Sequence, residues 1–175
     1  VYVALSNGTQ FVDKNGNPGS SDKWNDWLAI SPAEQVVIGD YDGDGKDDIA
    51  TWLGTTTRQV YVARSLGTGM GPAQVWVNSI GVNSSDVLMA GDANGDGKKD
   101  LILFARTQGK VYVALSDGAR FGNPTQWHGF FAVSTYERPR VAGERGARPR
   151  AGPPRRGHGR PRAAGRGGPR RGRRR

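Results

Sequence analysis

The sequence predicts an all-β fold assembled from similar units of four short strands. Three observations support this prediction: one strand-like segment recurs, an acidic turn recurs, and the apolar segments between them are too short for helices. VYVALS at residues 1–6 returns as VYVARS at 60–65 and as VYVALS at 111–116. Repetition at about 50 residues is typical of arrays in which each unit packs on its neighbours.

The apolar segments are predicted to be the strands. They are rich in Val, Ile, Tyr, Phe and Trp and are bounded by Gly, Asn, Asp and Pro, a composition typical of strands joined by turns. In the first unit they are QVVI at 35–38, IATWL at 49–53, QVYVARS at 59–65 and QVWVN at 74–78. In the second they are VLMA at 87–90, LILFA at 101–105, KVYVALS at 110–116 and TQWHGFF at 125–131. The polar insert DKNGNPGSSD at 13–22 is expected to form an extended loop between strands. Four-stranded units of this size predict the blades of a β-propeller or a comparable repeat array.

The turn GDYDGDGKDDIA, residues 39–50, joins the first two strands of the first unit and crowds carboxylates together. Two carboxylates about 4 Å apart repel by roughly 1 kcal/mol in water and by about 4 kcal/mol at an effective dielectric of 20, so a neutralising partner is expected. The glycine at 45 permits a sharp turn that brings the next main-chain carbonyl toward the same centre. Oxygen donors without His or Cys favour Ca²⁺. The predicted ligands are Asp40, Asp42, Asp44, Lys46 through its carbonyl, and Asp48.

A second turn, GDANGDGKKDLI at residues 91–102, repeats the pattern in the second unit. Asp and Gly are also good turn formers, so a single such stretch has a purely structural reading. The repetition of all five ligand positions, with Asn in place of Asp at the second, argues against that reading. The second predicted set is Asp92, Asn94, Asp96, Lys98 through its carbonyl, and Asp100, which gives two Ca²⁺ sites in all.

The motif D-x-[DN]-x-D-G-x-x-D after a short apolar strand, with VYVALSNG and a nearby Phe, resembles the FG-GAP or VCBS repeat family, whose best-known fold is the integrin alpha-type β-propeller. The resemblance covers residues 1–143. It implies a partial β-propeller of two complete four-stranded blades plus half-blades, with structural calcium in the acidic loops. Because such propellers close only with several blades, the remaining blades are expected from sequence outside this chain.

The charge distribution divides the chain a few residues before the end of this resemblance. Residues 1–137 carry 10 Lys and Arg against 15 Asp and Glu, whereas residues 138–175 carry 15 Arg and one Glu. With a one-residue slip relative to Trp127, Glu144 occupies the position of Asp40 and Asp92, and the repeat stops there. The Arg/Gly/Pro segment 144–175 cannot bury a core and is interpreted as disordered or as an out-of-frame reading of a GC-rich gene. The weaker alternative is that it binds nucleic acid through phosphate contacts.

No catalytic motif is evident, and a non-enzymatic protein is predicted. His128, beside a Trp in a predicted strand, is interpreted as structural, and the carboxylates converge on one centre rather than forming an acid and base pair. Trp24, Trp76 and Trp127 recur at one place in the repeat, which predicts inter-blade core residues, whereas Trp27 is the better candidate for a surface contact with a sugar.

The predicted function is therefore a calcium-stabilised module for binding or adhesion, with an unknown extracellular protein or carbohydrate as its ligand. The alternative is an ancillary, carbohydrate-binding domain of a larger secreted hydrolase. The chain starts at Val1 within a predicted strand and shows no signal peptide or apolar segment of membrane-spanning length. It is expected to be a fragment of a secreted or cell-surface protein.

Overall fold

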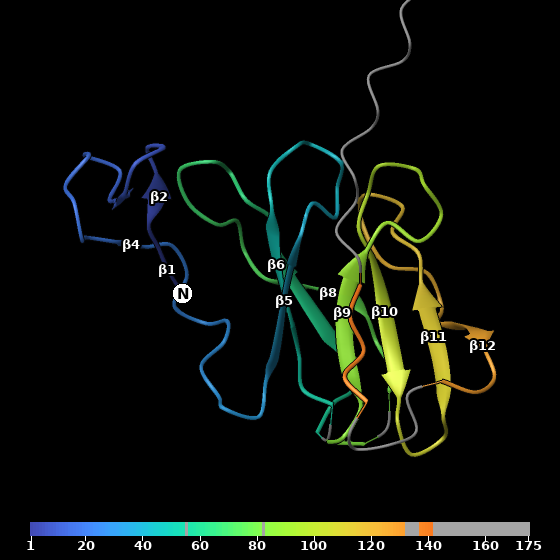
Figure 1. Cartoon of the computed structure of the whole chain (residues 1–175). Coiled ribbons are helices and arrows are strands. Elements are labelled where there is room, and N and C mark those ends of the chain that lie inside the picture. Colours follow the sequence, from blue (N-terminus) through green and yellow to red (C-terminus); the bar gives the residue numbers. More distant parts are fainter. Residues whose placement is uncertain (55, 82, 132–136, 142–175) are drawn as a thin grey trace, which may run out of the picture. The chain divides into compact units, whose positions relative to one another are not determined.

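Two four-stranded antiparallel sheets make up most of the computed structural model of this chain (Figure 1). The structure describes residues 1–54, 56–81, 83–131 and 137–141, all within one compact unit that runs from Val1 to Gly143. The predictions for Glu144 and the segment 144–175 therefore concern residues outside this description. The described residues contain no helix, and so none that could span a membrane.

Each sheet is a meander in which consecutive strands are neighbours, as the four-strand unit predicts. The all-β fold with propeller-like blades is confirmed. The first blade comprises β5 (Gln35–Gly39), β6 (Asp48–Trp52), β7 (Val60–Ala63) and β8 (Gln74–Val77). The second blade comprises β9 (Val87–Gly91), β10 (Asp100–Ala105), β11 (Lys110–Ala114) and β12 (Thr125–His128).

The two blades repeat each other in register as well as in order. The ladder between β7 and β8 shifts register between Val60 and Tyr61, and the ladder between β11 and β12 shifts between Val111 and Tyr112. These are the first two positions of the recurring VYVA segment in both blades. The irregularity is therefore a property of the repeat.

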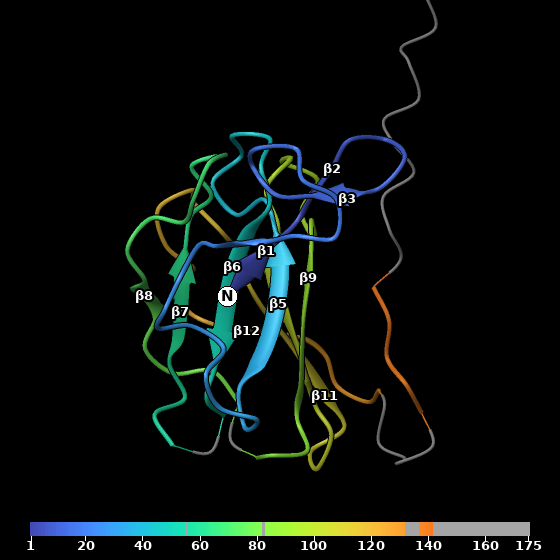
Figure 2. The same ribbon diagram turned by 90° about the vertical axis from the view of Figure 1, so that its left-hand side faces the viewer.

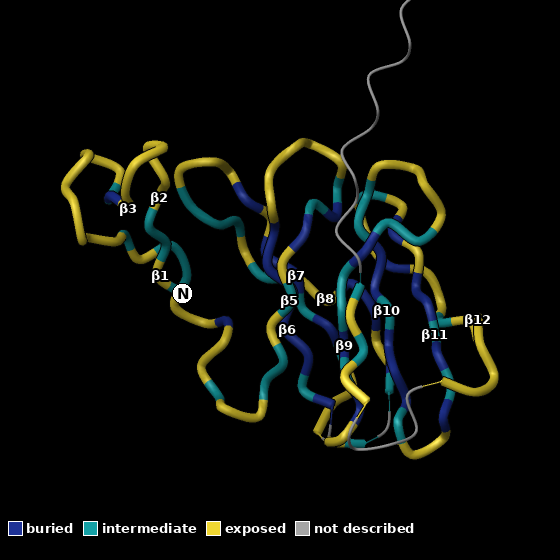
Figure 3. Tube along the Cα trace, viewed as in Figure 1, coloured by how far each residue is buried: buried dark blue, intermediate teal, exposed yellow. Residues whose placement is uncertain are grey.

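The main core lies between the two blades. Strands β5 and β9 run alongside each other and are in contact (Figure 2). All five residues of β6 are buried (Figure 3). Ala50 and Trp52 belong to the inter-blade cluster, whereas Ile49 packs with Leu28 in a second cluster. The inter-blade cluster includes Trp52, Val62, Leu101 and Leu103.

The first 34 residues form short pairings only. β1 (Tyr2–Val3) pairs with β4 (Asp22–Lys23), and β2 (Leu5–Ser6) pairs with β3 (Phe11–Val12). The insert at 13–22 connects β3 to β4, as expected for a loop between strands. The described residues that precede β5 therefore form no complete four-stranded blade.

Candidate cation-binding loops

Both acidic segments form the connection between the first and second strands of a blade. The first loop, residues 40–48, joins β5 to β6, and the second loop, residues 92–100, joins β9 to β10. The sheet register fixes the ends of both loops, because Gly39 pairs with Asp48 and Gly91 pairs with Asp100. Each loop is thus a tight hairpin connection anchored at the edge of its blade.

The leading aspartate folds each loop around its carboxylate. Asp40 Oδ1 accepts hydrogen bonds from the amides of Gly43 at 2.7 Å and Asp44 at 3.1 Å, and its Oδ2 accepts one from Gly45 at 2.8 Å. Gly43 and Gly45 have φ of 81° and 87°, a region that favours glycine. In the second loop Asp92 accepts from the three matching amides at 2.6, 3.1 and 2.9 Å.

The closing aspartate of each loop is fully buried and holds the loop to the rest of its blade. Asp48 Oδ2 accepts from the Tyr41 amide at 3.0 Å, and its Oδ1 accepts from the Ser65 amide at 2.8 Å. Burial raises the pKa of the Asp48 carboxyl; the hydrogen bonds from Ser65 and Tyr41 oppose this rise, and the negative charge of Asp42 adds to it.

Asp100 repeats this arrangement in the second loop. Its carboxylate accepts from the Ala93 amide at 2.9 Å and the Ser116 amide at 2.8 Å. Burial again raises its pKa, with the amide bonds of Ser116 and Ala93 opposing. The sequence pattern did not predict that Ser65 and Ser116 contact the loops. The recurrence of a serine at the end of both VYVA-x-S segments could have indicated such a role.

Three carboxylates of the first loop converge on one point. Asp40, Asp42 and Asp48 each offer one oxygen, and these oxygens all lie within 4.8 Å of one another. Two oxygens that bind the same Ca²⁺ at 2.3–2.6 Å are at most about 5 Å apart, so the three fit around a single ion. The second loop places Asp92, Asn94 and Asp100 at the matching positions, with an amide oxygen in place of one carboxylate.

The aspartate at the fifth position of each loop is paired with a lysine of the same loop. Asp44 accepts from both the amide and the ammonium of Lys46, and the ammonium hydrogen bond is the first cause that lowers the pKa of Asp44. Asp96 accepts from the Lys98 amide at 2.9 Å and lies 3.1 Å from its Nζ. The structure thus places these lysine side chains on predicted ligands, an interaction that the sequence pattern did not indicate.

The surroundings of the second predicted ligand differ between the two loops. The guanidinium of Arg64 lies 3.6 Å from Asp42 Oδ2 in the first loop. The second loop has the neutral Asn94 at the position of Asp42, and Leu115 at the position of Arg64. The first loop therefore has one more carboxylate at this position, that of Asp42, and one more positively charged side chain beside it, that of Arg64.

The first loop is also seated on the second blade. The Lys99 amide donates to the Asp40 carbonyl at 2.7 Å, and Ser116 Oγ donates to the Tyr41 carbonyl at 2.6 Å. The Tyr41 ring is buried and packs edge-on against Phe121, with centroids 5.3 Å apart. The geometry of the first loop therefore depends on both blades.

Replacing Asp48 by Ala is expected to destabilise the chain by about 2–4 kcal/mol in chelator. The substitution leaves the buried amides of Tyr41 and Ser65 without acceptors, each at a cost of about 1–3 kcal/mol. Asp47→Ala, at the exposed neighbouring position, is the matched control and should stay within about 0.5 kcal/mol of the parent. Urea unfolding in EGTA measures both, and equal effects of the two substitutions would refute the structural role of Asp48.

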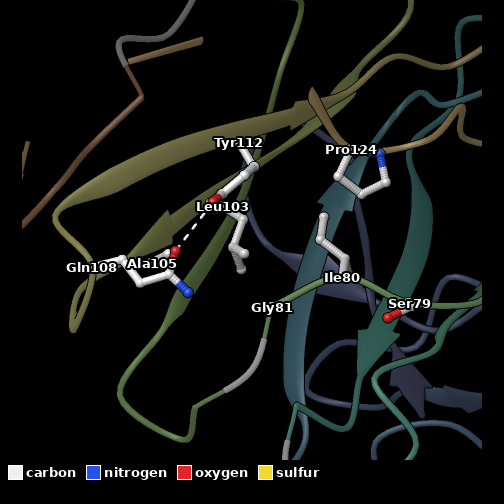
Figure 4. A pocket seen from close by; sticks show the side chains of 8 residues that line it. All are labelled: Ser79, Ile80, Gly81, Leu103, Ala105, Gln108, Tyr112 and Pro124. Carbon is white, nitrogen blue, oxygen red and sulfur yellow. Dashed lines mark hydrogen bonds between the residues drawn. The ribbon is translucent and has the colours of Figure 1, made fainter. Parts of the chain in front are cut away.

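A pocket of about 210 Å³ lies between the connection that follows β8 and the strands β10 and β11 (Figure 4). Its walls are mainly apolar, with Ile80 and Leu103 facing its interior. The Tyr112 hydroxyl and the Gln108 side chain are hydrogen-bonded to each other at 3.1 Å. The described residues of its lining include no charged side chain, so we interpret the pocket as a gap in inter-blade packing rather than a second polar site.

The tryptophans follow the predicted pattern in part. Trp76 is buried and packs on Phe121 of the second blade, as predicted for an inter-blade core residue. Trp24 is partly buried. The prediction is wrong for Trp127, which is 50% exposed, because the described residues include no blade after β12 that could cover it. His128 is exposed in β12 and accepts a hydrogen bond from the Phe130 amide.

The insert at 13–22 resembles the two loops in part. Asp13 Oδ1 accepts from the amides of Asn15 and Asn17 at 2.9 Å each, and the Lys14 amide donates to Asp22 Oδ2 at 2.6 Å. The Asn17 side chain donates to Asp13 Oδ2 at 2.9 Å, so the polar groups of this segment hold its own turn. We therefore assign only a structural role to the insert at 13–22.

Comparison with known proteins gives one family match. Residues 40–103 match a family model described as an FG-GAP-like repeat. The matched segment starts at the leading aspartate of the first loop and ends within β10, so it contains both loops. The predicted resemblance is confirmed for these residues. No protein with curated annotation matches the chain.

Proposed function

We propose that the chain is a β-propeller-like repeat module stabilised by two Ca²⁺ ions, in keeping with the FG-GAP-like repeat matched at residues 40–103. The observation that carries the proposal is the convergence of Asp40, Asp42 and Asp48 within 4.8 Å. Like charges at this distance oppose folding unless a cation lies between them. Their convergence in a hairpin connection of the fold is the arrangement that a structural cation needs.

The donor set favours Ca²⁺ over other cations. All side-chain donors are oxygens, whereas zinc and copper sites use His or Cys. Ca²⁺ accepts six to eight oxygens with loose geometry, and Mg²⁺ requires a near-ideal octahedron at shorter distances. In the loaded first loop, the carboxylates of Asp40, Asp42, Asp44 and Asp48 and the Lys46 carbonyl would hold the ion. In the second, Asp92, Asn94, Asp96, Asp100 and the Lys98 carbonyl would do so.

The proposed role of the ions is structural, and the module acts in extracellular binding or adhesion. FG-GAP-like repeats are generally non-catalytic, which supports a binding role. Millimolar or sub-millimolar calcium sites are typical of extracellular modules. Secretion or display at the cell surface is part of the same proposal.

A carbohydrate-binding role within a larger secreted hydrolase is the second candidate. One observation favours it: Trp27 is 54% exposed, and its ring meets Tyr61 edge-on with centroids 4.9 Å apart. An exposed tryptophan of this kind offers an apolar face on which a sugar ring can stack. The protein-binding and sugar-binding roles share the same calcium-stabilised scaffold.

Calcium titration of two single variants by isothermal calorimetry tests the proposal. Asp44→Ala should remove calcium binding at the first site, because affinity follows the number of charged ligands, and Asp96→Ala should remove it at the second. Each variant should keep the other binding event, whereas Asp47→Ala should keep both. A parent chain that binds no Ca²⁺ at about 10 mM contradicts the proposal, and loss of both events in one variant contradicts the assignment of two loops.

A further inference from the structure

The cation affinity of the first loop depends on a residue of the second. We propose that Lys98, which sequence position assigns to the second loop, lowers the affinity of the first loop for divalent cations. The inference rests on the proposed calcium function and identifies an affinity-determining residue of that site. Four structural observations support it.

The stem of Lys98 lies against the first loop. A side-chain carbon added at Gly43 would lie 3.1 Å from Lys98 Cγ and 3.6 Å from its Cδ. Gly43 stands between the proposed ligands Asp42 and Asp44. The ammonium is two bonds beyond Cδ, so it lies within a Debye length, about 8 Å at physiological salt, of this part of the loop.

Both the first loop and Lys98 are fixed in this arrangement. The amide of the adjacent Lys99 donates to the Asp40 carbonyl at 2.7 Å. A carbon added at Gly118 would lie 3.4 Å from the Asp42 carbonyl oxygen and 3.6 Å from Lys98 Cδ, so the turn of the second blade contacts both. The Lys98 side chain is 24% exposed and is less free to move away than Lys46, which is 43% exposed.

The ammonium of Lys98 is paired with a carboxylate of the second loop. Its Nζ lies 3.1 Å from Asp96 Oδ2, which neutralises the ammonium in part. When Asp96 turns toward a cation in the second loop, or is removed, the full positive charge remains beside the first loop. A positive charge at this range raises the free energy of a divalent cation bound there.

Lys46 provides the matched control within the same chain. It occupies the same position in the first loop and pairs with Asp44, as Lys98 pairs with Asp96. Its stem packs on Gly67, at the position that Gly118 has in the second blade, with both contacts at 3.6 Å. Its neighbouring charges are Asp44, Asp42 and Asp48 of its own loop. Lys46 should therefore not influence the second loop.

The test is calorimetric titration of the full chain with CaCl₂ in the Asp96→Ala background, where the first loop is the remaining site. Lys98→Met keeps the apolar stem and removes the charge, and it should tighten the first site about twofold to fivefold at low salt. The gain should shrink in about 0.5 M NaCl because of screening. Lys98→Arg retains the charge and should leave the affinity of the first site unchanged.

The control titration uses Lys46→Met in the Asp44→Ala background, where the second loop is the remaining site. The calcium affinity of the second loop should change by less than about 1.5-fold, since the charge removed lies in the first loop. If the Lys98→Met substitution leaves the calcium affinity of the Asp96→Ala chain unchanged, the inference is overturned and the proposed function stays intact. Absence of calcium binding in both backgrounds and in the parent would overturn both.

Discussion

Trp52→Ala is expected to lower the free energy of unfolding by about 3–5 kcal/mol, the largest loss from any single substitution considered. Trp52 is 1% exposed at the centre of the inter-blade core, and its Nε1 donates to the Ile80 carbonyl at 3.0 Å. The ring also fills the space beside two glycines. A side-chain carbon added at Gly81 would overlap the ring, and one at Gly54 would lie 2.6 Å from it.

The loss has two physical sources. Removing the indole leaves a cavity between blades that are each held by ladders of their own, so collapse is limited. It also leaves the Ile80 carbonyl without its donor. Because Trp52 lies in the first blade and Ile80 precedes the second, the substitution should weaken the contact between blades.

Urea unfolding followed by far-ultraviolet circular dichroism measures this effect. Trp127→Ala is the control, since Trp127 is 50% exposed, and it should change stability by less than about 0.5 kcal/mol. Trp52→Phe retains most of the packing and should lose less than the Ala variant, which keeps the test informative if the Ala variant does not fold. Equal stability of the Trp52→Ala chain and its parent would contradict the assignment of the inter-blade core.

The strands of the two blades were predictable because their pattern is local. Short β-branched segments between turn residues specify strands without reference to the rest of the fold. The segment VYVA shows the limit of this reasoning. At 60–63 it forms β7 between two partner strands, whereas at 1–4 only Tyr2–Val3 is a strand, paired with β4. The same four residues form different structures because a strand requires partner strands, and a short segment does not specify its partners.

The candidate ligands were predictable for a similar reason, since they lie within nine residues of one another in each loop. The groups that hold the loops in place were not. Ser65 reaches Asp48, and Ser116 reaches Asp100, only because the third strand of each blade pairs in a particular register with the second. The contact between Lys98 and the first loop depends on the packing of two blades, which no spacing within one unit reveals.

The calcium dependence of stability is the second large effect. At a free Ca²⁺ concentration of 100 times the dissociation constant, each independent site adds about 2.7 kcal/mol to the free energy of unfolding, so two sites add about 5 kcal/mol. For a folded unit of this size, that gain corresponds to a rise of roughly 10–20 °C in Tm. Mg²⁺ should give a smaller rise, because the loops supply a larger and less regular oxygen shell than it prefers.

The most direct measurement of the central claim is the Tm of the full chain in EGTA, in about 10 mM MgCl₂ and in about 10 mM CaCl₂. The two-site account predicts the highest Tm in CaCl₂, return to the EGTA value when chelator is added in excess, and about half the calcium-induced rise in Asp44→Ala or Asp96→Ala. The same Tm in EGTA and in CaCl₂ would contradict it.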